Sequence, residues 1–206
     1  MQPKFLYFDL GNVLVYFDHW IACRQMAEVA GLTPERVWQV AFASDLLHRY
    51  ETGQVDDRGF YEAFCQATGT RADYDRMLVA GSDIFRLNHS LLPVVAQLDG
   101  AGYPLGVLSN TSPAHWAWVT AGRFAIVNSA FCRYALSYEI GACKPEPKIY
   151  AAAAELAGYR PEQIFFVDDM PENVAGARQA GFDAVLYTST PQLVADLHAR
   201  GVEFNY

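Results

Sequence analysis

Residues 5–14 of the chain read FLYFDLGNVL. The first four residues are apolar or aromatic, which is typical of a strand buried on both faces of a sheet. An acidic residue, Asp9, follows immediately, and Gly11 and Asn12 after it favour a turn. This stretch therefore predicts a buried strand that ends in a carboxylate and a tight loop.

Three further apolar runs have the same strand-like character. They span residues 104–108, 164–167 and 184–187. Helix-like stretches lie beside these runs, at residues 91–100, 113–120, 147–157 and 172–180. The last two end at Gly158 and Gly181, as helices often do. Strands that alternate with helices predict an α/β fold with a doubly wound, Rossmann-like parallel sheet covered on both faces.

Residues 16–90 interrupt this alternation. They contain helical patterns at residues 21–30, 57–67 and 74–79, and we expect no strand there. A helical block between the first two strands predicts an inserted α-helical cap over the carboxyl edge of the sheet, where ligands of open α/β sheets bind. We therefore expect a core of residues 1–15 and 91–206 and a cap of residues 16–90.

Several reactive side chains follow predicted strands or precede predicted helices. Each has an ordinary explanation when taken singly, because an acidic residue after a strand is usually a turn or helix-capping residue. Two adjacent carboxylates after a buried strand are harder to explain, since they repel each other unless a cation is present. The carboxyl ends of parallel strands meet at one edge, so we expect one site there. Its members would be Asp9, Ser109, Lys144, Asp168 and Asp169.

The composition fits a packed, acidic protein. Of 206 residues, 52% are hydrophobic and 18% charged, and the formal net charge is −8. This charge argues against a nucleic-acid surface or a polybasic membrane patch. No apolar run approaches the roughly 18 residues that cross a bilayer, and no leader pattern begins the chain, so we expect a cytoplasmic protein. The four cysteines lack C-x-x-C spacing, and we expect reduced, mostly buried thiols.

Four ordered motifs resemble those of the haloacid dehalogenase-like (HAD) hydrolase superfamily. They are D-L-G-N-V-L at 9–14, L-S-N-T at 108–111, K-P at 144–145 and F-V-D-D at 166–169, with Asn173 after the last. The resemblance covers essentially the whole chain. Within the superfamily the chain is similar to subfamily I, whose helical cap lies between the first two motifs. The first motif and the cap segment at 50–53 look most like a bacterial sugar-phosphate phosphatase group that includes α-D-glucose-1-phosphate phosphatase.

The resemblance implies a phosphatase that acts on a small phosphorylated metabolite, with a sugar phosphate the expected substrate. Asp9 would attack phosphorus and form an aspartyl-phosphate that water hydrolyses. Ser109 and the Asn110 N–H would hydrogen-bond phosphoryl oxygens, and Asn12 is a further candidate for substrate contact. Lys144 would stabilise charge on the phosphoryl oxygens.

The same resemblance implies a Mg²⁺ cofactor, because a carboxylate that meets a phosphate dianion needs a cation to offset the repulsion. The ligands would be Asp9, the Gly11 carbonyl and Asp169. Asp168 would either support these ligands or hold metal-bound water, and Asn173 would support the metal side.

One position departs from the superfamily pattern. Phosphatases of this superfamily usually read D-x-D, and the second Asp protonates the leaving group, but here that position is Gly11. General acid catalysis contributes about 10²- to 10⁴-fold. Substrates with good leaving groups would suffer least from its loss, and a cap residue such as Asp18 or His19 could supply the proton. Tyr50 and Glu51 could face the substrate or merely pack in the cap.

Two other functions stay open at this stage. The dehalogenase branch uses a similar Asp, Ser-Asn and Lys without metal, but Asp168 and Asp169 favour a cation. A non-catalytic binding protein on the same scaffold is motivated by Gly11, although the nucleophile and Lys144 are retained. The sequence does not distinguish a monomer from a homodimer.

Overall fold

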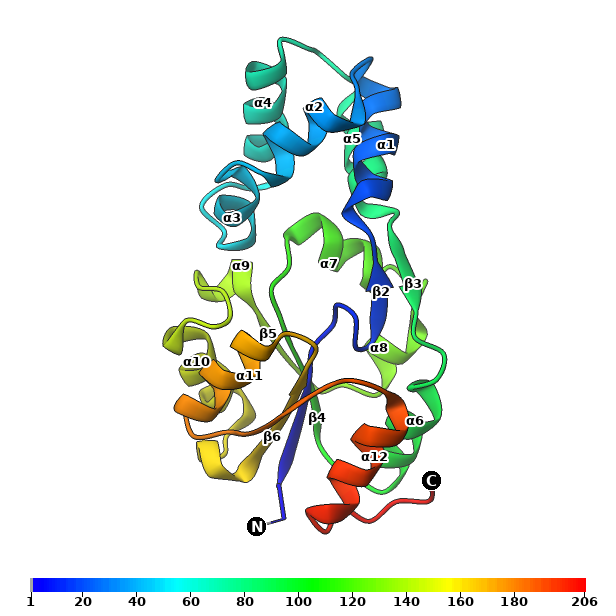
Figure 1. Ribbon diagram of the computed structural model, residues 1–206, viewed down its shortest axis with the longest axis vertical. Coiled ribbons are helices and arrows are strands. Elements are labelled where there is room, and N and C mark those ends of the chain that lie inside the picture. The colour runs from blue at the N-terminus through cyan, green and yellow to red at the C-terminus, as the bar shows by residue number, and fades with distance from the viewer. Residues whose placement is uncertain (1) are drawn as a thin grey trace.

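The central element of the fold is a parallel sheet of five strands in the order β5-β4-β1-β6-β7, and the computed structural model describes residues 2–206 (Figure 1). The strands are β1 (Phe5–Phe8), β4 (Leu105–Ser109), β5 (Arg133–Leu136), β6 (Ile164–Asp168) and β7 (Asp183–Leu186). The expected doubly wound α/β fold is confirmed. Because β1 lies between β4 and β6, the loop that carries Asp9 lies at the centre of the carboxyl edge.

The alternation of side chains along β1 explains why helices cover both faces of the sheet. Leu6 and Phe8 pack in one apolar cluster, and Phe5 and Tyr7 pack in a second cluster on the opposite face. The first face is covered by α6 (Leu92–Gly100), α7 (Pro113–Thr120), α8 (Ala125–Ser129) and α12 (Thr190–Ala199). The second is covered by α9 (Ser137–Ile140), α10 (Pro147–Ala157) and α11 (Pro171–Gln179), while the short 3-10 turn η2 (Pro161–Gln163) precedes β6.

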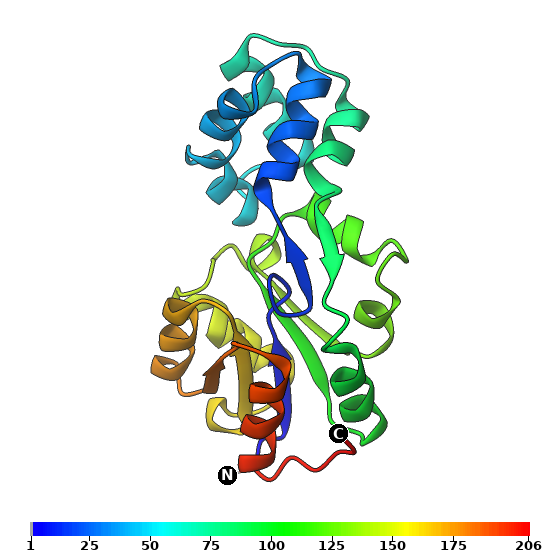
Figure 2. The same cartoon turned by 45° about the vertical axis from the view of Figure 1, so that its right-hand side comes forward.

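The helices between β1 and β4 form their own apolar cluster, in which Cys23, Met26 and Phe64 are buried. They are α1 (His19–Ala30), α2 (Pro34–Val37), the π-helix η1 (Trp38–Phe42), α3 (Leu46–Glu51), α4 (Asp57–Thr68) and α5 (Tyr74–Ser82). Figure 2 shows this bundle at the top of the molecule, above the carboxyl edge of the sheet. A separate cluster supports our proposed division into a core of 1–15 and 91–206 and a cap of 16–90.

The expectation that residues 16–90 hold no strand is wrong. β2 (Val15–Phe17) and β3 (Phe85–Leu87) form a two-stranded antiparallel ribbon that connects the two parts, with Phe17 opposite Phe85. Each strand has three residues, too few to give a readable alternation. The strand β5 was also outside the expected set because its sequence, RYAL, begins with polar and half-buried residues.

Two further expectations concern the membrane and the cysteines. Within residues 2–206, no helix is both long and apolar enough to cross a membrane. All four cysteines are free, but only Cys23 and Cys143 are buried, and Cys132 is exposed. The expectation of mostly buried thiols is therefore only half right.

Candidate active site

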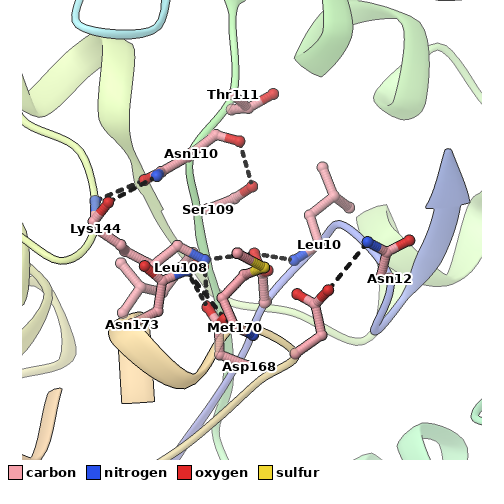
Figure 3. A network of polar contacts seen from close by, with 12 residues as sticks. Leu10, Asn12, Leu108, Ser109, Asn110, Thr111, Lys144, Asp168, Met170 and Asn173 are labelled. Carbon is pink, nitrogen blue, oxygen red and sulfur yellow. Dashed lines mark hydrogen bonds and ion pairs between the residues drawn. The ribbon is translucent and has the colours of Figure 1, made fainter. Parts of the chain in front are cut away.

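The strand ends bring the expected polar residues together at the carboxyl edge of the sheet (Figure 3). Asp9 follows β1, Ser109 ends β4 and Asp168 ends β6, while Lys144 comes from the loop between α9 and α10. Exposed fractions of 6% for Asp9, 2% for Ser109, 5% for Lys144 and 0% for Asp168 show that the group is buried. Burying charges costs free energy unless they are paired with opposite charges and hydrogen-bonded.

The Lys144 ammonium is surrounded by acceptors. Its Nζ lies 2.7 Å from Asp9 Oδ1 and 2.7 Å from Asp168 Oδ2, and it donates to the Leu108 carbonyl at 3.1 Å. Burial lowers the pKa of Lys144, but the two carboxylates outweigh burial and the net pKa is raised. The ammonium therefore stays charged beside Asp9.

The side chain of Asn110 holds the backbone of Lys144. From the sequence we expect only that the Asn110 N–H binds a phosphoryl oxygen. The Asn110 amide donates from Nδ2 to the Lys144 carbonyl at 3.0 Å, and its Oδ1 accepts the Lys144 N–H at 2.7 Å. Asn110 therefore fixes the loop that carries Lys144.

Asp168 has partners on both carboxylate oxygens. Oδ1 accepts from the Met170 N–H at 2.8 Å and from Asn173 Nδ2 at 3.0 Å, and Oδ2 accepts from Lys144. Asn173 thus orients Asp168. Saturated in this way, Asp168 is suited to positioning Lys144.

Asp169 lies closer to the loop after β1. It accepts a hydrogen bond from Asn12 Nδ2 at 3.0 Å, and burial raises its pKa above the usual range. Asn12 has a positive φ of 53°, a conformation that asparagine tolerates better than most residues. This turn brings the Asn12 amide to Asp169, which the motif spacing could not reveal.

Asp9 is bonded through one oxygen. Oδ1 accepts from the Leu10 N–H at 2.7 Å and faces Lys144, whereas no hydrogen bond between the described residues ends on Oδ2. Burial raises the pKa of Asp9, and Lys144 opposes that rise. The protein therefore orients Oδ1, whereas Oδ2 is available to a ligand.

Three carboxylates lie within reach of a single cation. Oxygens of Asp9, Asp168 and Asp169 lie within 4.8 Å of one another. Only one ammonium, that of Lys144, faces this acidic group in the part of the chain described, so negative charge remains in excess. Carboxylate oxygens are the donors that Mg²⁺ prefers, and the residues present fit such an ion.

Gly11 stands where the superfamily usually has its acid, and the structure fills the space beside it. A Cβ added at Gly11 would lie 2.7 Å from Cε1 of the Phe17 ring. Phe17 also packs against His19, with ring centroids 4.9 Å apart. A side chain at position 11 would therefore require Phe17 to move.

A cavity of about 180 Å³ lies over these residues and is lined from both sides. The core contributes the polar group already described, and the cap contributes Glu51 and His19. Asp18 does not line it, because this residue caps α1 by accepting the Trp20 N–H at 2.8 Å. Tyr50, one residue before Glu51, is buried and donates to Asp57.

His115 also lines the cavity, although no motif in the sequence singles it out. It lies in α7, its Nε2 is 3.1 Å from the Gly81 carbonyl in the cap, and its ring meets Phe85 edge-on. Burial lowers the pKa of His115 to about 4. Its place two residues after Pro113, near the start of a helix that follows the second motif, was the available signal.

The buried carboxylates and Lys144 thus lie at the carboxyl edge of a doubly wound sheet, the edge where α/β proteins bind their ligands. Residues 4–181 match the haloacid dehalogenase-like hydrolase family. The chain belongs to that family, and the expected resemblance is confirmed.

Similar proteins include three phosphatases. A phosphatase of Mycobacterium tuberculosis is 33% identical over 98% of this chain and 96% of its own length. D-ribitol-5-phosphate phosphatase of Bacteroides thetaiotaomicron is 29% identical over 87% and 89%. Glyceraldehyde 3-phosphate phosphatase of Methanopyrus kandleri is 33% identical, but the match spans 46% of this chain and only 40% of that protein.

Among solved structures, a HAD family enzyme of Bacteroides thetaiotaomicron in complex with magnesium and inorganic phosphate aligns with a TM-score of 0.81. It is 25% identical, and the alignment covers 91% of this chain and 96% of that one. Together with the named phosphatases, this similarity supports the expected enzyme class, a phosphatase.

Proposed function

We propose that this chain is a Mg²⁺-dependent phosphomonoester hydrolase that acts on a small phosphorylated metabolite, a sugar phosphate, through an aspartyl-phosphate intermediate. The observation that carries the proposal is the pairing of Asp9 with Lys144 in a capped cavity, beside two more carboxylates. Two relatives are named for phosphorylated sugars or polyols, D-ribitol 5-phosphate and glyceraldehyde 3-phosphate, which supports this substrate class.

Asp9 is the proposed nucleophile. The Leu10 N–H and Lys144 hold Oδ1, so Oδ2 is the oxygen that attacks phosphorus. Lys144 is placed to stabilise negative charge on the phosphoryl oxygens as the bond to Asp9 forms.

The phosphoryl group would be bound at the end of β4. Ser109 Oγ and the Asn110 N–H are the proposed donors, and Asn12 contributes from the other side of the cavity. These groups line the cavity together with Lys144, so they could hold the phosphoryl group against Asp9.

Mg²⁺ would be held by Asp9, the Gly11 carbonyl and Asp169, with Asp168 behind them. When bound, the ion offsets the charge repulsion between the carboxylates and the phosphate. The magnesium complex of a solved relative supports this choice of cofactor.

The dehalogenase reading is less well supported. A metal-free reaction gives no reason to place Asp9, Asp168 and Asp169 oxygens within 4.8 Å of one another with one lysine to balance them. The charge excess favours a cation and hence a phosphate substrate. A non-catalytic binding protein is disfavoured because the ion pair between Asp9 and Lys144 is intact.

Phosphate release from a panel of sugar, acyl, nucleotide and alkyl phosphates tests the proposal, with Mg²⁺ and with a chelator. We expect release from sugar phosphates with Mg²⁺, and a fall on the order of 10⁴-fold for Asp9→Asn because the nucleophile is removed. Asp99→Asn, an exposed acidic residue of α6, is the matched control. Acid-quenched wild-type protein should carry a phosphoryl group on Asp9.

No release from any phosphate, with the variants folded, would refute the phosphatase. Release of halide from haloacids in the presence of chelator would favour the dehalogenase instead.

A further inference from the structure

The reaction proposed above needs a proton for the leaving group, and the usual position cannot supply one. Gly11 has no side chain, and the Phe17 ring occupies the adjacent space at 2.7 Å from a Cβ built there. The donor must therefore come from another residue that lines the cavity.

Three titratable side chains line the cavity apart from the lysine and the acidic group at the sheet edge. They are His19, Glu51 and His115. His115 faces the Gly81 carbonyl through Nε2, which requires the N–H on that nitrogen, so this proton is already engaged. Its pKa of about 4 leaves the ring neutral near pH 7.

His19 is a weak candidate for a similar reason. Its ring packs between Phe17 and Phe42, with centroids 4.9 Å and 4.7 Å away. Burial lowers its pKa, so the imidazolium that could act as an acid is disfavoured. Glu51 is left.

Glu51 ends α3, and the segment around it is fixed to the core at several points. The Tyr50 hydroxyl accepts the N–H of Ala114, in α7 of the core, at 3.4 Å, and it donates to Asp57 within the cap. A Cβ at Gly53 would clash with the Tyr138 carbonyl oxygen, which shows how closely the turn after α3 approaches α9.

The Glu51 backbone also lies beside the loop of the catalytic lysine. The Cys143 thiol points its Sγ to the Glu51 carbonyl at 4.0 Å, and Cys143 directly precedes Lys144. Among the described residues, no hydrogen bond ends on the Glu51 carboxyl group. This carboxyl is therefore positioned at the cavity without a protein partner.

Resting on the proposed function, we propose that Glu51 is the general acid that replaces the missing Asp, protonating the leaving-group oxygen from the cap side. Asp9 Oδ2 forms a bond to phosphorus, the bond from phosphorus to the leaving oxygen breaks, and that oxygen takes the Glu51 proton. Water then attacks phosphorus, one of its protons passes to Glu51, and the bond from phosphorus to Asp9 Oδ2 breaks. Phosphate is released, and the Asp9 carboxylate and the Glu51 acid are both restored.

The electrostatics agree with this role. Burial raises the pKa of Glu51 to about 7, although the Lys144 charge opposes the rise. A carboxyl group with a pKa near the working pH can both give and take a proton. Cys143, whose thiol contacts the Glu51 backbone carbonyl, has a pKa raised by burial and stays a neutral thiol near pH 7.

The test compares leaving groups in the Glu51→Gln variant. With a sugar phosphate, whose alkoxide needs a proton, we expect kcat/KM to fall about 10²- to 10³-fold. With p-nitrophenyl phosphate, whose phenolate leaves without one, we expect a change of less than about 5-fold. Glu51→Asp should recover part of the sugar-phosphate activity. Glu62→Gln makes the same change on an exposed face of the cap and should leave kcat/KM unchanged with both substrates.

An equal loss on both substrates would overturn the proposal, because a structural or binding role does not distinguish leaving groups. Unchanged activity with the sugar phosphate would overturn it as well. Wild type that releases no phosphate from either substrate would instead refute the phosphatase itself. Thermal unfolding of each variant separates these results from misfolding.

Discussion

Lys144 in the core and Glu51 in the cap face the same cavity, but their surroundings differ. Lys144 has two carboxylates within 2.7 Å and a carbonyl at 3.1 Å, so its charge is balanced within the protein. The Glu51 carboxyl has no hydrogen-bond partner among the described residues, and burial disfavours its charge. The charge of Lys144 is thus held in place by the core before substrate binds. The Glu51 carboxyl group of the cap, in our proposal, has its hydrogen-bond partner only in the bound substrate.

The origin of the two groups differs in the same way. The core residues sit at the ends of buried strands, whose direction is fixed by the parallel sheet. The cap residues depend on how a separate helical cluster rests on that edge, through contacts such as Tyr50 to Ala114 and His115 to Gly81. Variants on each side should therefore fail in different ways.

The largest effect on stability is expected for Lys144→Met. Removing the ammonium leaves the buried carboxylates of Asp9 and Asp168 without their partner, which costs about 3–5 kcal/mol of unfolding free energy. Activity should also fall, on the order of 10²- to 10³-fold. Urea unfolding and phosphate release measure the two effects. Lys148→Met, on an exposed lysine of α10, should change stability by less than about 0.5 kcal/mol.

If Lys144→Met were as stable as wild type, the balance of charge described for the core would be wrong.

A smaller effect is expected where the core meets the connecting ribbon. Gly11→Ala places a methyl group against the Phe17 ring and should destabilise the protein by about 1–3 kcal/mol. Phe17→Leu, combined with it, should cost less than the sum of the two single changes, with a coupling of about 1 kcal/mol. Gly100→Ala is the control, because a Cβ there has no neighbour within 4 Å. Additive effects would show that Phe17 does not fill the space beside Gly11.

The smallest effect concerns the contact of His115 with the cap. Because the folded pKa of about 4 lies below the usual value of about 6.5, the unfolded state binds the proton first as the pH falls. The stability that neutral His115 contributes is therefore complete above about pH 6.5 and is lost as the pH falls toward 4, with about 1 kcal/mol lost between about pH 6.5 and pH 5.5. His115→Gln, which does not titrate, should lack this part of the pH dependence. The unfolding free energies of wild type and His115→Gln, measured at several pH values, give the effect as their difference. A difference that does not change with pH would contradict the prediction.

The sequence by itself determined the family and the polar group at the sheet edge. Apolar strands followed by Asp9, Ser109 and Asp168 are local patterns, and parallel strands carry their carboxyl ends to one edge whatever the rest of the chain does. The helices α6, α7, α10 and α11 of the core and α1, α4 and α5 of the cap were also readable, from periodicity and terminal glycines, whereas α8, α9 and α12 were not expected.

Only the tertiary structure decided what lies opposite that group. The three-residue strands of the ribbon have too little pattern to read, yet they place Phe17 against Gly11. Glu51 and His115 reach the cavity because two separately packed apolar clusters meet there, and no spacing in the sequence encodes the distance between them. Local hydrophobic pattern fixes where a strand ends, whereas the burial that shifts the pKa of Glu51 and His115 exists only once the cap rests on the core.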